Sequence, residues 1–206
     1  MLTQAQKGLA FRALHTRDHA FIIPNPWDVG TARLLAYLGF EALATTSAGY
    51  AFSVGQQDNT IGRPEMMAHV SAIASATDLP VSADLENGFG DSPQIVAETV
   101  TLAAAAGLAG CSIEDMSRQP GRLIYKFDHA VERVRAAAEA ARSLSFAFTL
   151  TARAPRTTWR AIPISETRSN DCRLIRRLAP TFSMRPALAA KTTLARWLSL
   201  WTARST

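Results

Sequence analysis

The sequence predicts an α/β protein built on a parallel β-sheet, and three observations support this fold class. Short apolar runs alternate with helix-like segments at a spacing of roughly 30 residues, the length of one β-α-β unit. Glycine or proline marks many of the boundaries between these segments. Carboxylates, a serine and an arginine recur where the apolar runs end. A (β/α)8 barrel and an open α/β sheet both gather functional side chains at that edge, so this pattern alone fits either architecture.

The helices are expected to be bounded by local signals. Asp28 can cap the second helix, Gly39 follows its last turn, and Pro64 suits the first turn of the third. Residues 47–63 form a polar stretch long enough to be a substrate loop, and residues 116–126 form a second loop. The expected helices are 3–15, 28–38, 64–77, 93–106 and 128–143; the expected strands are 21–24, 41–46, the start of 81–91, 110–115 and 146–151.

The rest of the chain is organised around residues 81–91, VSADLENGFGD. Asp84 and Glu86 are two residues apart, so in a continuing strand their side chains point to the same side. Two hard oxygen ligands followed by glycines suit a Mg²⁺ ion that keeps several waters and shares its shell with a bound anion. The alternative is an acidic strand end followed by a solvated turn.

Composition indicates a globular protein in a reducing compartment. Apolar residues make up 48% of the chain, an ordinary share for a soluble domain. No apolar run has the length of a membrane span, and the N-terminal segment lacks the pattern of a signal peptide. Cys111 and Cys172 match neither a C-x-x-C nor a zinc pattern and are expected to be reduced thiols. We therefore expect a cytoplasmic protein with no membrane partner.

Charge and glycine content change abruptly near residue 155. The net charge of the whole chain is +5, but residues 155–206 hold ten Lys or Arg and two acidic residues, a net charge of +8. Residues 1–154 therefore carry −3, and all eleven glycines lie at or before Gly121. A shift of this kind indicates either a domain boundary or a break in the reading frame.

Five separated motifs occur in order along residues 5–154. They are N-P-W-D at 25–28, T-S-A-G-Y-A-F-S-V-G-Q-Q-D at 46–58, S-A-D-L-E-N-G-F-G-D at 82–91, S-I-E-D at 112–115 and T-A-R at 151–153. In this combination the sequence resembles the isocitrate lyase/phosphoenolpyruvate mutase superfamily. The resemblance implies a (β/α)8 barrel, of which about the first five β/α units are present.

The resemblance also implies a site, a cofactor and a reaction class. It implies Mg²⁺ and a 2-oxo, enolpyruvate or phosphono acid whose C–C or P–C bond is made or broken through an enolate-like species. An intact member is implied to be a homo-oligomer, often a tetramer; for this chain the assembly stays open. The implied metal ligands are Asp58, Asp84, Glu86 and Glu114, the implied substrate-binding residues are Ser47, Ala48, Trp27, Asp28 and Arg153, and the implied catalytic residues are Arg153 and Glu114.

Three of these residues have simpler interpretations. Asp58 could be an ordinary loop aspartate, Arg153 a surface charge at a strand end, and Trp27 a packing residue.

Lyases of the superfamily carry a K-x-C-G-H-type loop after the fourth strand, whereas residues 116–122 read MSRQPGR, without cysteine. A cysteine-dependent isocitrate or methylisocitrate lyase is therefore disfavoured. The closer resemblance is to the carboxyvinyl-carboxyphosphonate phosphorylmutase or phosphoenolpyruvate mutase-like branch.

After Ala154 the sequence departs from the family pattern, which would continue with E-N and a strand of the type G-A-D-V-L-Y-A-P-G. Read one nucleotide earlier with suitable synonymous codons, residues 155–165 become AENYLAGHPDL and residues 176–191 become KAGADVLYAPGLGGK. We therefore expect a partial barrel over 1–154, then a frameshift and an irregular basic tail over 155–206.

A catalytically inactive remnant is the main alternative function. Nucleic-acid binding by the tail is disfavoured because it has no recognisable motif.

Overall fold

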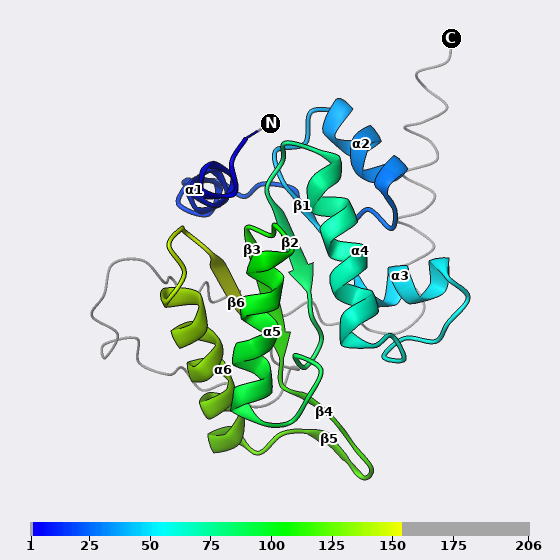
Figure 1. Ribbon diagram of the computed structural model, residues 1–206, viewed down its shortest axis with the longest axis vertical. Coiled ribbons are helices and arrows are strands. Elements are labelled where there is room, and N and C mark those ends of the chain that lie inside the picture. Colours follow the sequence, from blue (N-terminus) through cyan, green and yellow to red (C-terminus); the bar gives the residue numbers. More distant parts are fainter. Residues whose placement is uncertain (1, 154–206) are drawn as a thin grey trace, which may run out of the picture. The chain divides into compact units, whose positions relative to one another are not determined.

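A four-stranded parallel sheet forms the centre of the protein in the computed structural model, which describes residues 2–153 (Figure 1). The strand order is β1-β2-β3-β6, and the registers pair Leu43 with Val81, Ala83 with Cys111, and Cys111 with Leu150. The frameshift and tail expected over 155–206 lie outside the described residues. The strands are β1 (Leu43–Ala44), β2 (Val81–Asp84), β3 (Gly110–Glu114) and β6 (Thr149–Arg153).

Helices alternate with the strands, and side chains at their first turns explain where several of them begin. Asp28 caps α2 by accepting a hydrogen bond from the Thr31 amide at 2.8 Å, and Ser92 caps α5 through the Ile95 amide at 3.3 Å. Figure 1 shows α5 and α6 side by side along the sheet. The helices are α1 (Gln4–Leu14), α2 (Val29–Tyr37), α3 (Ser47–Ser53), α4 (Arg63–Ala76), α5 (Pro93–Ala105) and α6 (Phe127–Arg142).

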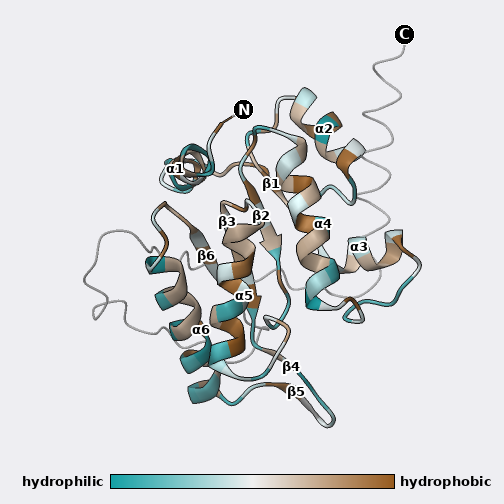
Figure 2. Ribbon diagram, in the orientation of Figure 1, coloured by the Kyte–Doolittle hydropathy of each residue, from teal (hydrophilic) through white to brown (hydrophobic). Residues whose placement is uncertain are grey.

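The main core lies between the sheet and the helices that pack on it. In Figure 2 apolar colours predominate along α5, whereas polar residues recur along α6. A smaller cluster forms around α1, where Phe11 and Leu14 pack with Ala42 and Ala109 at the amino ends of β1 and β3. The opposite, carboxyl edge of the sheet is left for polar side chains. Fully buried members of the main core include Leu43, Val70, Ile73, Val81, Val96, Val100, Leu108 and Leu150.

Three expectations about secondary structure were wrong. Residues 21–24 form no strand; Ile22 is 73% exposed, and one hydrogen bond, from the Ala44 amide to the Pro24 carbonyl at 3.1 Å, joins the segment to β1. The stretch 47–63 is not entirely loop, because it begins with α3. Residues 116–126 contain an antiparallel hairpin, β4 (Met116–Gln119) with β5 (Arg122–Ile124).

The strand that carries the acidic motif ends earlier than expected. β2 stops at Asp84, and Glu86 adopts a left-handed backbone conformation with φ of 50°. The expected alternation of Asp84 and Glu86 on one strand face is therefore wrong. No helix within residues 2–153 has the length and apolarity that crossing a membrane requires.

Candidate active site

A cavity of about 320 Å³ opens at the carboxyl edge of the parallel sheet. Its wall contains three carboxylates, from Asp58, Asp84 and Glu114, together with several hydroxyl and amide oxygens. Concave sites at this edge are the usual location of ligands in parallel α/β proteins. The lining residues are Asn25, Thr45, Thr46, Ser47, Ala48, Asp58, Asn59, Asp84, Glu114 and Met116.

Asp84 is held in a fixed orientation by its neighbours. The Ser47 hydroxyl donates to its Oδ2 at 3.0 Å, and the Ser47 amide lies 3.4 Å from the same oxygen. Its other oxygen, Oδ1, accepts from the Glu86 amide at 3.2 Å. The Asp84 amide in turn donates to the Thr45 hydroxyl at 3.2 Å. Hydrogen bonds to both carboxylate oxygens fix the direction in which Asp84 can bind a cation.

The first turn of α3 forms the wall beside Asp84. Thr46 caps this helix by accepting a hydrogen bond from the Gly49 amide at 3.3 Å, and Ser47 and Ala48 line the cavity. The polar stretch that was expected to be a substrate loop therefore contributes its first residues to the cavity as a helix start. Asp58 reaches the same cavity from the segment after α3.

Glu114 and Arg153 end two neighbouring strands. The register of β3 and β6 pairs their backbones directly, so the two residues lie at the same edge of the sheet. The Glu114 amide donates to the Glu86 carbonyl at 2.7 Å, which joins the end of β3 to the residues after β2. Asp115, the next residue, is 6% exposed, and this burial raises the pKa of its carboxyl to about 6.

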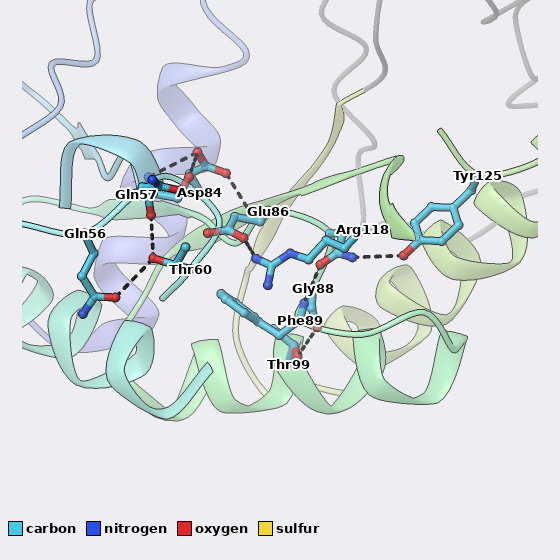
Figure 3. A network of polar contacts seen from close by, with 12 residues as sticks. Gln56, Gln57, Thr60, Asp84, Glu86, Gly88, Phe89, Thr99, Arg118 and Tyr125 are labelled. Atoms are coloured by element: carbon cyan, nitrogen blue, oxygen red, sulfur yellow. Dashed lines mark hydrogen bonds and ion pairs between the residues drawn. The ribbon is translucent and has the colours of Figure 1, made fainter. Parts of the chain in front are cut away.

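Glu86 lies beside the cavity but is not among its lining residues. Its side chain is 2% exposed and forms an ion pair with Arg118, which is provided by β4 (Figure 3). The Arg118 guanidinium carbon lies 5.8 Å from the centre of the Phe89 ring. In the described structure, Arg118 thus provides the charge that Glu86 was expected to receive from a metal.

Trp27 and Asp28 also lie outside the cavity lining. A Cβ on Gly49 would overlap the Trp27 indole, so this ring packs closely against α3, in line with the packing interpretation. The Asp28 carboxylate accepts hydrogen bonds from the Thr31 hydroxyl and amide, which lower the pKa of Asp28. Its observed contacts are those of a helix cap.

A buried arginine that the sequence analysis did not identify holds the loop after β2. Arg133, on α6, is 1% exposed and donates to the carbonyls of Gly90 and Asp91 at 2.5 Å each, and to the carbonyl of Asn87. Its guanidinium carbon lies 4.2 Å from the centre of the Tyr125 ring. Burial lowers the pKa of Arg133. Nothing in the sequence distinguishes it from the neighbouring arginines of α6.

The hairpin is attached to the same loop. The Tyr125 hydroxyl donates to Asp91 Oδ1 at 2.5 Å and accepts from the Asn87 side-chain amide at 3.0 Å. The Gln119 side chain donates to the other Asp91 oxygen at 2.9 Å. Consequently, α6, the hairpin and the loop after β2 form one connected unit beside Glu86.

The cavity suits a hard cation in its donor chemistry, although residues 2–153 contain no ready-made cage of three or more His, Cys, Asp or Glu side chains. Every polar lining side chain offers oxygen: carboxylates, hydroxyls and the amides of Asn25 and Asn59. Mg²⁺ commonly binds through one or two carboxylates and retains waters, so a complete protein cage is not required. Asp58, Asp84 and Glu114 are the carboxylates that could hold it.

A parallel α/β sheet with an acidic, oxygen-lined cavity at its carboxyl edge is an arrangement typical of α/β-barrel enzymes. The family model for phosphoenolpyruvate phosphomutase matches residues 11–176, and the chain belongs to this family, within the phosphoenolpyruvate mutase/isocitrate lyase superfamily. The fold is of the (β/α)8-barrel type, as expected from the motifs, and residues 2–153 supply four of its parallel strands.

Three relatives illustrate the range of the similarity. A solved structure of a candidate lyase/mutase from Burkholderia cenocepacia J2315 is 64% identical, with a TM-score of 0.72, and the match covers 73% of this chain and 55% of that one. The 2-methylisocitrate lyase of Escherichia coli K12 is 31% identical over 141 residues, 65% of this chain and 48% of the enzyme. The 2,3-dimethylmalate lyase of Eubacterium barkeri is 31% identical over 136 residues, which cover 62% of this chain and 47% of that enzyme. The chain spans about half the length of these curated relatives.

Proposed function

We propose that the chain carries the site of a Mg²⁺-dependent lyase or phosphonomutase. Its substrate is a small 2-oxo acid, enolpyruvate or phosphono acid that reacts through an enolate-like species. The observation that carries this proposal is the cavity in which Asp58, Asp84 and Glu114 meet the start of α3, in a chain of this family. The named relatives act on 2-methylisocitrate and 2,3-dimethylmalate, both small carboxylic acids.

Asp84, Glu114 and Asp58 would hold the cation, with Glu86 as a further ligand once its pairing with Arg118 is broken. Mg²⁺ in such a site supplies a Lewis acid that favours negative charge on a neighbouring substrate oxygen. The Ser47 hydroxyl keeps the Asp84 carboxylate in place at 3.0 Å. The hydroxyls and the backbone at the start of α3 are suited to orient a substrate carboxylate.

Arg153 is proposed to bind the anionic end of the substrate, since its backbone pairs with that of Glu114 at the cavity edge. A guanidinium matches a carboxylate or phosphonate through two parallel hydrogen bonds, which a lysine cannot make. Together, these residues would bind the substrate between a cation on one side and a fixed positive charge on the other.

Binding of Mn²⁺, as a spectroscopic substitute for Mg²⁺, and of oxalate, as an enolate mimic, tests the proposal. We expect oxalate to bind only when the metal is present. Asp84→Asn should weaken Mn²⁺ binding at least tenfold, because replacing residues that merely hydrogen-bond to a metal ligand already costs about 10- to 100-fold in metal affinity. Asp18→Asn, at an exposed position in the loop after α1, is the matched control and should bind as the wild type does. Metal-independent oxalate binding, or an unaffected Asp84→Asn variant, would contradict the proposal.

The abrupt change of charge and glycine content near residue 155 is the observation behind a second candidate, a catalytically inactive barrel remnant. A remnant should show little or no metal-dependent oxalate binding. Resequencing the DNA around codon 154, together with the intact mass of the protein from its native cells, would show whether the proposed shift of reading frame is real. A heavier protein with the E-N continuation restored would favour the enzyme.

A further inference from the structure

The ion pair between Arg118 and Glu86 joins a surface hairpin to a buried carboxylate. The Glu86 side chain is 2% exposed, whereas that of Arg118 is 35% exposed. Figure 3 shows the Arg118 side chain running from the hairpin to Glu86, with the Phe89 ring alongside. An isolated carboxylate is costly to bury, so Glu86 requires a cationic neighbour. Arg118 fills that requirement in the described structure.

The Glu86 backbone is fixed between two carboxylate residues of the cavity. Its amide donates to Asp84 Oδ1 at 3.2 Å, and its carbonyl accepts from the Glu114 amide at 2.7 Å. Glu86 Oε1 is buried and has no hydrogen-bond partner among residues 2–153. The Glu86 carboxylate therefore stays beside the cavity with unused acceptor capacity, and a cation bound by Asp84 and Glu114 would be close to it.

Electrostatic attraction also links Arg118 to Asp58, a carboxylate of the cavity wall. Burial lowers the pKa of Arg118, and the charges of Tyr125 and Asp58 oppose this effect. Met116, two residues earlier in β4, lines the cavity. Arg118 therefore comes from a strand that reaches the cavity, and at 35% exposure its side chain is not enclosed by its neighbours.

We propose that Arg118 and a divalent cation compete for the Glu86 carboxylate, and that cation binding frees the Arg118 guanidinium to bind a second anionic group on the substrate. This inference rests on the proposed function and narrows its substrate class to 2-oxo acids that carry a further carboxylate or phosphonate. A guanidinium recognises either group through paired hydrogen bonds. Arg118 is then a specificity-determining residue.

The first measurement is the affinity for Mn²⁺ in the absence of ligand, for the wild type, Arg118→Gln and Arg17→Gln. Because no ion pair has to be broken in Arg118→Gln, we expect it to bind Mn²⁺ roughly tenfold more tightly than the wild type. Arg17 is the matched control, because it forms an exposed ion pair with Glu41 at 2.5 Å, and its replacement should leave Mn²⁺ affinity unchanged. Unchanged or weaker Mn²⁺ binding by Arg118→Gln would overturn the inference.

The second measurement compares ligands at saturating Mn²⁺. The wild type should bind phosphonopyruvate or difluorooxaloacetate more tightly than pyruvate, and Arg118→Gln should lose about tenfold or more of that preference, with Arg118→Lys intermediate. Of the two ligands, the one whose affinity falls more in Arg118→Gln identifies the group that Arg118 prefers, phosphonate or carboxylate. If Arg118 served only to hold the hairpin, its removal would weaken Mn²⁺ and all ligands together, which would contradict the inference.

The two proposals fail in different ways. A wild-type chain that binds neither Mn²⁺ nor oxalate overturns the proposed function, and this inference with it. A wild-type chain that binds both, with Arg118→Gln indistinguishable from it in metal affinity and ligand preference, overturns the role of Arg118 alone.

Discussion

Gly110 is the position at which one added methyl group should disturb both the core and the site. It begins β3 opposite Thr149 of β6. A Cβ there would overlap the Thr149 carbonyl oxygen and lie 3.1 Å from the Thr149 Cβ and 3.2 Å from the Phe11 ring. Because two of these obstacles belong to a paired strand, β3 and β6 must separate to accommodate it. Overpacking together with a weakened ladder hydrogen bond is expected to lower the free energy of unfolding by about 2 to 4 kcal/mol in Gly110→Ala.

Urea unfolding followed by far-UV circular dichroism measures this loss, and Gly62→Ala is the matched control. Gly62 has an ordinary φ of −77°, and a Cβ there would meet only Pro64 Cδ, at 3.8 Å. The free energy of unfolding of Gly62→Ala should therefore stay within about 0.5 kcal/mol of the wild-type value. The reasoning would be refuted if Gly110→Ala were no less stable than Gly62→Ala. Since Glu114 and Arg153 end the same two strands, Gly110→Ala should also weaken Mn²⁺ binding.

Three further predictions concern single side chains. Ser47→Ala removes the 3.0 Å hydrogen bond to Asp84 and should weaken Mn²⁺ binding about tenfold by calorimetry, whereas Ser53→Ala, which loses a bond within α3, should not. Thr3→Ala breaks the capping box of α1 and should lower the free energy of unfolding by about 1 kcal/mol in urea. Hydrogen bonds from Tyr125 and Gln119 lower the pKa of Asp91, so its stabilising contribution exists above the ordinary carboxyl pKa and is lost as pH falls through the lower folded value. In a circular dichroism pH titration, Tyr125→Phe should therefore begin to unfold at higher pH than the wild type.

The helices could be predicted well because their signals are local. Helices expected at 3–15, 93–106 and 128–143 occur at Gln4–Leu14, Pro93–Ala105 and Phe127–Arg142. Capping residues and apolar periodicity act within a few residues of the chain. α3 was missed because seven residues are too few to show that periodicity. Residues 21–24 are apolar like a strand, but strand formation depends on partners that the apolar run does not specify.

The candidate site could be predicted in its residues but not in their contacts. Motif positions identified Asp58, Asp84 and Glu114, and the structure places all three in one cavity. The placement of Glu86 depends on a left-handed backbone turn and on Arg118, which lies 32 positions later in the sequence and carries no local signal. Long-range pairings of this kind require the folded chain to be known. The roles of these residues in metal and substrate binding remain predictions.

The clamp that Arg133 forms on the loop after β2 has a consequence for synthesis of the protein. The carbonyls that it binds lie 42 to 46 residues earlier in the chain. While the chain emerges from the ribosome, amino end first, the loop is synthesised well before Arg133, whose guanidinium donates to the loop carbonyls. Until α6 is complete, these carbonyls lack the guanidinium that binds them in the folded protein. The carboxyl edge of the sheet, which carries the candidate site, therefore reaches its final geometry only after most of its own residues have been translated.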